Sequence, residues 1–301
     1  MSAVAARIGN SVHAALPPVA RAFLEQQQLA VLAAADARGR PWASALTGAP
    51  GFLRVVDERT VRVAAPHQPA SEAPVTSGDP AGLLVPDFAT RRRLRVNGRM
   101  ERASDRAILI RAEQVYANCP KYIQRRTLNP TRLVPAASPR VGARAATLTE
   151  AQREWIRRAD TFFIATLNPG EGADASHRGG MPGFVSVAGD RLTWADYAGN
   201  NMFNTLGNIT VHPYAGLLFP DFVTGATLHL TGRAALHWKA AGGESPPDAG
   251  AAATGRLVEL VVEEVVEMRD AWPVSGGAVE YSPFNPSPAA GPHAARTAAE
   301  S

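Results

Sequence analysis

A run of five residues in the second half of the chain combines polar side chains with glycines in a way that suits an anionic ligand. It reads Ser176, His177, Arg178, Gly179 and Gly180. The planar guanidinium of Arg178 forks onto phosphate oxygens, and neighbouring glycines let a ligand approach the backbone closely. A solvated surface arginine is the alternative, and phosphate contact is favoured. For His177, ligand contact and a hydrogen bond that fixes its tautomer stay equally open.

A stretch compatible with a helix, residues 199–208, lies further along the chain. The N-terminus of a helix presents free N–H groups to a phosphate. Asn200, Asn201 and Thr205 add side-chain donors there, and Tyr197 comes shortly before the stretch. We assign these four residues to the same ligand site as the Ser-His-Arg-Gly-Gly run.

The first half of the chain supplies a different polar segment, residues 118–126, which has no counterpart in the second half. Lys121 and Arg125 suit a phosphate or a substrate anion, and Tyr122 suits the face of a planar ring. We expect this closing arm to reach across to the site. Cys119 is interpreted as a small buried residue in preference to a nucleophile.

The charge balance is modestly basic, with a net charge of +4 and a pI of about 9.6. This excess fits an anionic partner or simple solubility. The arginine-rich stretch 90–99 invites a nucleic-acid reading, but it lacks interleaved aromatic residues for base stacking. Its alternation at Leu94, Arg95, Val96 and Asn97 fits a half-exposed strand with arginine on the wet face, and a position facing the groove between the domains stays open for some of these arginines. No nucleic-acid partner is therefore predicted.

Several other classes of site are disfavoured by the sequence. Histidine and acidic residues are not clustered as in a metal site, so no metal is predicted. The single cysteine excludes an intramolecular disulfide. No apolar run has membrane-spanning length, and the N-terminus lacks an apolar signal core. The expectation is a cytoplasmic protein without a membrane partner.

An internal repeat organises these segments. Residues 81–99 read AGLLVPDFATRRRLRVNGR and residues 215–233 read AGLLFPDFVTGATLHLTGR, which agree at eleven of nineteen positions without a gap. The match extends upstream of these strings, and two copies of about 130 residues are too few and too long for a solenoid. They predict two homologous domains packed as an internal pseudo-dimer, and a homodimer of the whole chain stays open.

Each copy has the same expected order of elements, a helix followed by short strands between turn signals. Many short strands of this kind predict a closed barrel, so the fold class is mainly β with flanking helices. The expected helices span 17–28 and 149–160, the second with a capping box from Thr149 and Gln152. The expected strands are 29–34, 51–56, 60–65, 82–85, 94–100, 108–115, 161–167, 183–187, 191–195, 215–219, 227–236 and 257–268.

These elements divide the chain into a first domain at 17–135 and a second at 148–273. A flexible N-terminus at 1–16, a linker at 136–147 and a flexible C-terminal tail at 274–301 complete the division. The copies differ where the phosphate site is expected. In the first copy, prolines at 66, 69, 74 and 80 exclude a regular helix, so its phosphate site is expected to be degenerate.

The strings quoted above, together with residues 90–99 and 196–208, resemble the pyridoxamine 5'-phosphate oxidase-like, FMN-binding split barrels, in particular tandem proteins of the flavin-nucleotide-binding type. The resemblance implies two split β-barrels with FMN in the groove between them. It assigns the phosphate to the strand and helix of one barrel and the closing residues to the other. One FMN per chain follows if only the second copy keeps the phosphate site.

The same resemblance implies a flavin-dependent oxidoreductase that acts on an unidentified small molecule. A backbone N–H of Gly179 or Gly180 would tune the flavin ring, and no catalytic side chain is identified. A non-enzymatic flavin carrier or sensor is a second hypothesis. A third is a split barrel that binds deazaflavin or haem, for which His177, His212, His229 and His237 are available as haem ligands.

Overall fold

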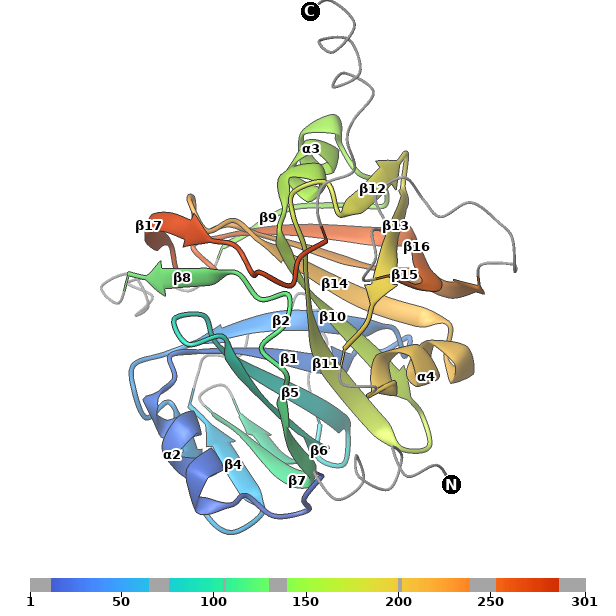
Figure 1. Ribbon diagram of the computed structural model, residues 1–301. Coiled ribbons are helices and arrows are strands. Elements are labelled where there is room, and N and C mark those ends of the chain that lie inside the picture. The colour runs from blue at the N-terminus through green and yellow to red at the C-terminus, as the bar shows by residue number, and fades with distance from the viewer. Residues whose placement is uncertain are drawn as a thin grey trace, which may run out of the picture.

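The two sequence repeats fold into two β-barrels with the same strand order (Figure 1). The first sheet has the order β2-β1-β5-β6-β7-β4-β3, and the second has the order β11-β10-β14-β15-β16-β13-β12. This computed structural model describes residues 12–64, 76–104, 107–129, 140–199, 202–238 and 253–286. All strand pairs in both sheets are antiparallel, so the predicted tandem split-barrel fold is confirmed.

The elements of the first copy and its extension are α2 (Pro18–Gln26), β1 (Leu29–Ala35), β2 (Pro41–Thr47), β3 (Leu53–Val55), β4 (Thr60–Val63), β5 (Pro80–Asp87), β6 (Arg92–Ser104), β7 (Ala107–Asn118) and β8 (Arg125–Leu128). Those of the second copy are β9 (Arg140–Ala145), α3 (Glu150–Arg158), β10 (Thr161–Asn168), β11 (Gly172–Gly179), β12 (Val185–Ala188), β13 (Arg191–Tyr197), α4 (Asn204–Val211), β14 (Tyr214–Pro220), β15 (Thr227–Trp238), β16 (Ala253–Arg269) and β17 (Ser275–Glu280). The capping box of Thr149 and Gln152 at the start of α3 is confirmed.

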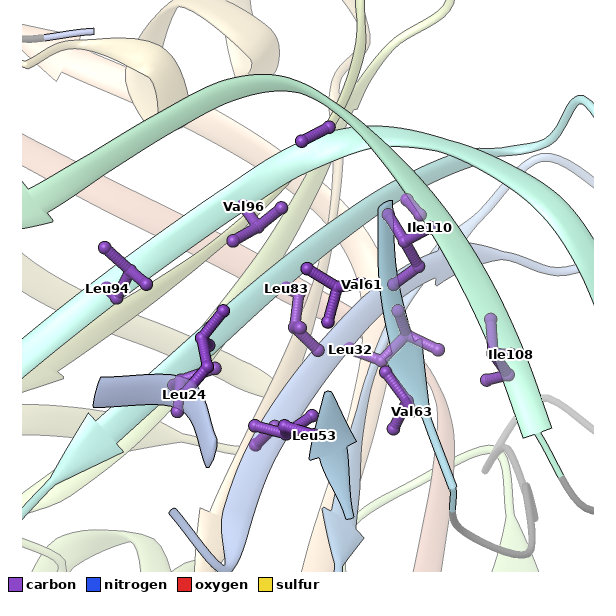
Figure 2. Packing of buried hydrophobic residues seen from close by; sticks show 14 of the residues in the cluster. Leu24, Leu32, Leu53, Val61, Val63, Leu83, Leu94, Val96, Ile108 and Ile110 are labelled. Carbon is purple, nitrogen blue, oxygen red and sulfur yellow. The ribbon is translucent and has the colours of Figure 1, made fainter. Parts of the chain in front are cut away.

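Each barrel encloses an apolar core built by side chains that alternate along its strands. In β7, Ile108 and Ile110 point inward while Arg111 and Glu113 point to solvent, which is the period of two expected for a half-buried strand. Figure 2 shows these isoleucines packed against Leu32 and the strands around it. The sequence alternation was therefore a reliable guide to the interior of each barrel.

A third apolar core lies between the barrels and is built largely by β1 and β10, which are buried on both faces. Leu32 points into the first barrel while Val31 points into the shared core. In the second copy, Phe162 points into the second barrel and Phe163 points into the shared core. Burial on both faces explains why these strands read as continuous apolar runs. The rings of Phe88 and Phe222 meet edge to face in this shared core.

Glycines in the repeated AGLL string let the barrels approach each other closely. A Cβ atom on Gly82 of β5 would lie 2.8 Å from the Cα of Asp174 in β11. A Cβ on Gly216 of β14 would lie 2.3 Å from the carbonyl oxygen of Pro41 in β2. Real side chains do not tolerate such distances, so both crossings require glycine. The repeat thus preserves the contact between the two copies.

Two described strands, β9 and β17, lie outside the two predicted domains. β9 lies in the predicted linker and pairs with β16, so that segment belongs to the second sheet. β17 lies in the predicted flexible tail and pairs with β8 of the first copy. Ser282, just beyond β17, is buried. These pairings tie the C-terminal segment to the closing arm, which neither hydrophobic periodicity nor composition indicated.

Among the described residues, the structure holds no helix of sufficient length and apolar character to cross a membrane.

Candidate functional site

A groove between the two barrels gathers half of the site residues that the sequence singled out. It encloses about 600 Å³ of space, part of it open to solvent. The first copy contributes the ends of β6 and β7 and the start of the closing arm, and the second contributes β11, β13 and the residues that follow it. The lining residues are Arg93, Arg95, Asn118, Cys119, Lys121, Tyr122, His177, Arg178, Gly179, Phe184, Trp194, Ala195, Asp196, Tyr197 and Gly199.

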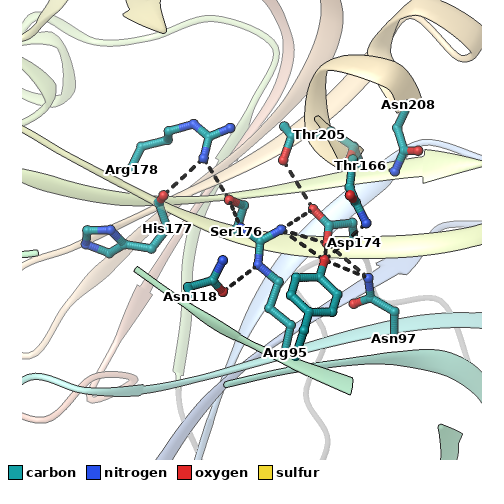
Figure 3. A network of polar contacts seen from close by, with 12 residues as sticks. Arg95, Asn97, Asn118, Thr166, Asp174, Ser176, His177, Arg178, Thr205 and Asn208 are labelled. Atoms are coloured by element: carbon teal, nitrogen blue, oxygen red, sulfur yellow. Dashed lines mark hydrogen bonds and ion pairs between the residues drawn. The ribbon is translucent and has the colours of Figure 1, made fainter. Parts of the chain in front are cut away.

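A buried hydrogen-bond network anchored on Asp174 holds the two sides of the groove together (Figure 3). Arg95 Nη1 contacts both oxygens of the Asp174 carboxylate, at 2.9 and 3.0 Å. Asn97 and Tyr116 of the first copy also donate to this carboxylate, and Thr205 of α4 donates from the second. Removal of any one partner leaves a buried polar group unpaired, which makes the network a rigid connection between the copies.

Arg95 also orders the neighbouring Arg178 through a shared hydroxyl. Arg95 Nη2 and Arg178 Nη1 both donate to Ser176 Oγ, each at 2.7 Å. Ser176 has no exposed surface, so its hydroxyl serves the two guanidinium groups. Arg178 makes its other side-chain hydrogen bond to the His177 carbonyl oxygen. The serine therefore positions the arginine that faces the groove.

Positive charge accumulates at the groove without matching negative charge. Arg93, Arg178 and Lys121 have no ion pair with a carboxylate in the described part of the chain, whereas Arg95 is paired with Asp174. Burial, with the charges of Arg95 and Arg178 nearby, lowers the pKa of Arg93 to about 9. Burial also lowers the pKa of Arg178, and the charge of Asp196 opposes this effect. An anion in the groove would stabilise the charged forms of these arginines.

His177 is a neutral imidazole whose tautomer is set by its neighbour. Burial first, and then the charge of Arg93, hold the pKa of His177 well below its usual range. Arg93 Nη1 lies 2.8 Å from Nδ1. A guanidinium can only donate, so Nδ1 accepts and the proton resides on Nε2. Nε2 has no partner among the described residues, and neither has Trp194 Nε1 at the same groove. Two buried N–H donors on lining residues of the groove therefore lack a protein partner among the described residues.

The closing arm lines the groove and contacts the second copy. Tyr122 and Tyr197, one from each copy, place their ring centroids 5.1 Å apart, and the Tyr122 hydroxyl donates to the Ala198 carbonyl. Gln124 fastens the arm from beneath, because its buried amide donates to the Gly180 carbonyl and accepts from the backbone N–H of Ser282. The arm is therefore held by the second copy and by the C-terminal segment.

The structure brings six of the predicted site residues to the groove, namely Lys121, Tyr122, His177, Arg178, Gly179 and Tyr197. Thr205 points instead to Asp174, and Arg125 forms an exposed ion pair with Glu280. α4 begins at Asn204, later than the predicted stretch 199–208. Asn200 and Asn201 lie outside the described residues.

The two glycines differ in what they contribute. The N–H of Gly180 donates to the Asp160 carbonyl at 3.1 Å. Contrary to the expectation, this N–H is therefore not available to a flavin ring. A Cβ on Gly179 would lie 2.1 Å from the Tyr122 carbonyl oxygen. Gly179 is therefore required for the closing arm to pack against β11. Its close approach is to the chain itself.

The residues that sequence reasoning missed are mainly those of β6 and β11. Arg95 was assigned to the wet face of its strand, with the groove between the domains left open for some arginines of this stretch, and it lies buried against the second barrel together with Asn97. Asp174 was not singled out, although it is the centre of the network. Cys119 was expected to be buried, and it lies half-exposed at the groove. Alternation marked the polar face of β6 correctly but could not show that a second domain covers it.

The equivalent groove on the other side of the pseudo-dimer has lost these groups. Strand pairing places Trp42 at the position of Asp174 and His229 at that of Arg95. Leu46 replaces Arg178 by the same register. Trp42 is 1% exposed and packs against Val266, so a side chain fills the space. Of these two equivalent grooves, as far as the described residues show, the one at Arg178 retains the cationic lining.

A family model described as pyridoxamine 5'-phosphate oxidase matches residues 16–142 and matches again at residues 148–268. The two matches cover one barrel each and most of the chain. The chain belongs to the pyridoxamine 5'-phosphate oxidase family. Within this family it is a tandem member with two copies of the domain. The search of curated proteins gave no match.

Solved structures similar to this pyridoxamine 5'-phosphate oxidase family member are single-barrel in extent and distant in sequence. A pyridoxamine 5'-phosphate oxidase-related, FMN-binding protein of Nostoc punctiforme is 12% identical, with 42% of this chain and 86% of that chain covered and a TM-score of 0.29. HupZ of Group A Streptococcus is 12% identical, with 43% and 99% covered and a TM-score of 0.31. The haem storage protein HutZ of Vibrio cholerae is 8% identical, with 45% and 94% covered and a TM-score of 0.26.

Proposed function

We propose that the groove binds one FMN per chain and that the protein is an FMN-dependent oxidoreductase acting on a small organic molecule. The observation that carries the proposal is the set of cations without carboxylate partners, Arg93, Lys121 and Arg178, on one groove. Family membership supports a flavin as the ligand. The phosphate dianion of FMN supplies the negative charge that these side chains lack.

The chain's own groups suit the rest of the ligand as well. Arg178, held by Ser176, is placed to take the phosphate. The unpaired N–H groups of His177 and Trp194 suit the carbonyl oxygens of a flavin ring. Tyr122 and Tyr197 would flank the flavin ring at the edge of the groove. FMN would supply the electron chemistry, and the protein would bind it, orient it and set its electrostatic surroundings.

The tautomer of His177 disfavours the haem alternative. An axial haem ligand needs a free lone pair, and His177 carries its proton on Nε2, the nitrogen that lacks a partner. Both nitrogens of His229 are engaged by Thr227 and Ala43, and Nε2 of His212 by Gly39. His237 is more than half exposed, beside Glu259 and outside the groove lining.

The absorbance spectrum and released ligand of the purified full chain test the proposal. We expect an oxidised-flavin spectrum, release of FMN identified by mass, and one flavin per protein. A ratio near two would contradict the single site, and a Soret band would overturn the flavin assignment. A deazaflavin would differ in released mass. Reduction by a nicotinamide cofactor and repeated turnover with an acceptor would distinguish an enzyme from a carrier.

A further inference from the structure

A second cavity lies behind the groove, on the far side of the Arg95–Asp174 pair. It encloses about 820 Å³ of space, part of it open to solvent. We call it the amide cavity, because side-chain amides dominate its wall between β6, β7, the β10–β11 hairpin and α4. Its polar side chains are Asn97, Glu113, Gln114, Asn168, Glu171, Asp174, Asn204 and Asn208.

Asn97 is one of the lining residues of this cavity, and its buried side-chain oxygen has no hydrogen-bond partner among the described residues. Its Nδ2 lies 3.1 Å from Asp174 Oδ1, and a carboxylate only accepts, so the amide orientation is fixed. The Oδ1 atom is therefore left over, and it has no hydrogen-bond partner among the described residues. Only 6% of Asn97 is exposed. A buried acceptor of this kind favours a ligand that donates.

Two asparagines of α4 are oriented in the same sense. The Tyr116 hydroxyl donates to Asp174, so its oxygen accepts from Asn204 Nδ2 at 3.1 Å. Asn208 Nδ2 lies 3.1 Å from Thr166 Oγ1. Both amides spend a donor on the protein, so their Oδ1 atoms remain as acceptors. Figure 3 shows Asn97 and Asn208 near Asp174, while Arg178 lies beyond Ser176.

The charge of the amide cavity points to a cation. No lysine or arginine is among its described lining residues. Asp174 is neutralised by Arg95, and Glu113 lies 3.4 Å from Arg99. Glu171 has no ion pair in the described part of the chain, which leaves one uncompensated carboxylate. A primary ammonium group offers three N–H donors and one positive charge to such a wall.

We propose that the amide cavity is a second binding site, which takes a small primary ammonium ion through the Asn97 and Asn204 oxygens and the Glu171 carboxylate. An ammonium ion matches both the excess of acceptors and the single negative charge. A phosphate would meet carboxylate and amide oxygens without a lysine or arginine to balance it. The amide cavity therefore favours a cation, whereas the groove on the other side of Asp174 favours an anion.

Calorimetric titration of the full chain with butylammonium chloride tests this proposal. We expect saturable binding at one site. Butan-1-ol, which lacks the charge, and tetramethylammonium chloride, which lacks N–H donors, are expected to bind at least tenfold more weakly. Equal binding of either compound, saturable binding of inorganic phosphate at this cavity, or no butylammonium binding would overturn the proposal.

Two substitutions locate the site without disturbing the buried network. Glu171→Gln removes the exposed carboxylate and is expected to weaken butylammonium binding about two- to fivefold, and Glu58→Gln is the matched exposed control. Glu171→Lys brings its own ammonium group and is expected to abolish binding. If Glu58→Gln and Glu171→Gln behave alike, the cavity is not the site. Flavin content measured on the same samples separates this result from the groove, because Glu171 lies outside the groove lining.

Discussion

Trp42 and Asp174 occupy the same register position in the two barrels, and each lies under a glycine of the other copy. Strand β5 crosses β11 at Gly82 and Asp174, and strand β14 crosses β2 at Gly216 and Trp42. The carboxylate recruits Arg95 and orders one groove, whereas the indole fills the other and donates its N–H to Asp36. The difference between the two grooves therefore begins at a single pair of equivalent positions.

Replacing Arg178 tests the anion site. Arg178→Leu removes a charged phosphate donor and is expected to weaken FMN binding about ten- to a hundredfold. Quenching of flavin fluorescence during titration measures the affinity. Arg125→Leu is the matched control, because this arginine pairs with Glu280 outside the groove lining and its loss should leave the affinity unchanged. Equal losses in both variants would contradict the assignment.

The buried pair of Arg95 and Asp174 makes a prediction for stability. Asp174→Asn leaves the Arg95 guanidinium buried without its counter-charge and is expected to cost about 3 kcal/mol of unfolding free energy. Urea denaturation followed by tryptophan fluorescence measures the loss. The double variant Arg95→Leu, Asp174→Leu removes both charges and should lose less than Asp174→Asn. A double variant that is the less stable would refute this account.

His229 predicts how stability depends on pH. Burial lowers its pKa from 6.5 to about 4. The unfolded chain therefore takes up this proton first, so the stabilisation is complete above pH 6.5 and is lost as the pH falls towards 4. Between pH 7.5 and pH 5 the loss is about 2 kcal/mol of unfolding free energy.

Urea titrations at several pH values test the role of His229. The variant His229→Gln should show a flatter pH dependence than the parent chain. His237→Gln should keep the parent's slope, because the His237 side chain is 53% exposed. The buried, neutral His177 acts in the same direction as His229, so some slope should remain in His229→Gln.

Gly179 predicts a link between backbone packing and ligand affinity. Gly179→Ala places a methyl group against the Tyr122 carbonyl and should displace the closing arm, with a cost of about 2 kcal/mol in stability and a lower FMN affinity. Gly207→Ala is the contrasting control, since no atom lies within 4 Å of its added Cβ. That helical substitution should stabilise the chain by up to about 1 kcal/mol. Thermal melting and flavin titration of both variants measure these effects.

The sequence predicted the architecture well because the repeat and the apolar strands carry local signals. β1 and β10 were recognised as apolar runs, and the capping box of Thr149 fixed the start of α3. β11 was harder to recognise, since its alanine, serine and glycine residues have little preference for strands. It is a strand because β10 pairs with it and β5 packs across it.

Part of the site was predicted, because some of its residues carry a local signal in the sequence and others do not. Arg178 and the closing arm were identified by residue type and by the resemblance. Arg95 and Asp174 are distant in sequence and come together only when the barrels pack. No local pattern distinguishes an arginine that faces water from one that faces another domain. The same limit applies to β17, whose partner β8 belongs to the other copy.

The filled groove at Trp42 has a consequence for how such a protein can change over generations. In a homodimer of identical barrels, every substitution is present twice, so a bulky residue that closes one cleft closes its twin. Here each barrel is encoded by its own stretch of gene. Trp42 could therefore fill one cleft while the other cleft kept its charged lining, a combination that a dimer of identical barrels cannot reach.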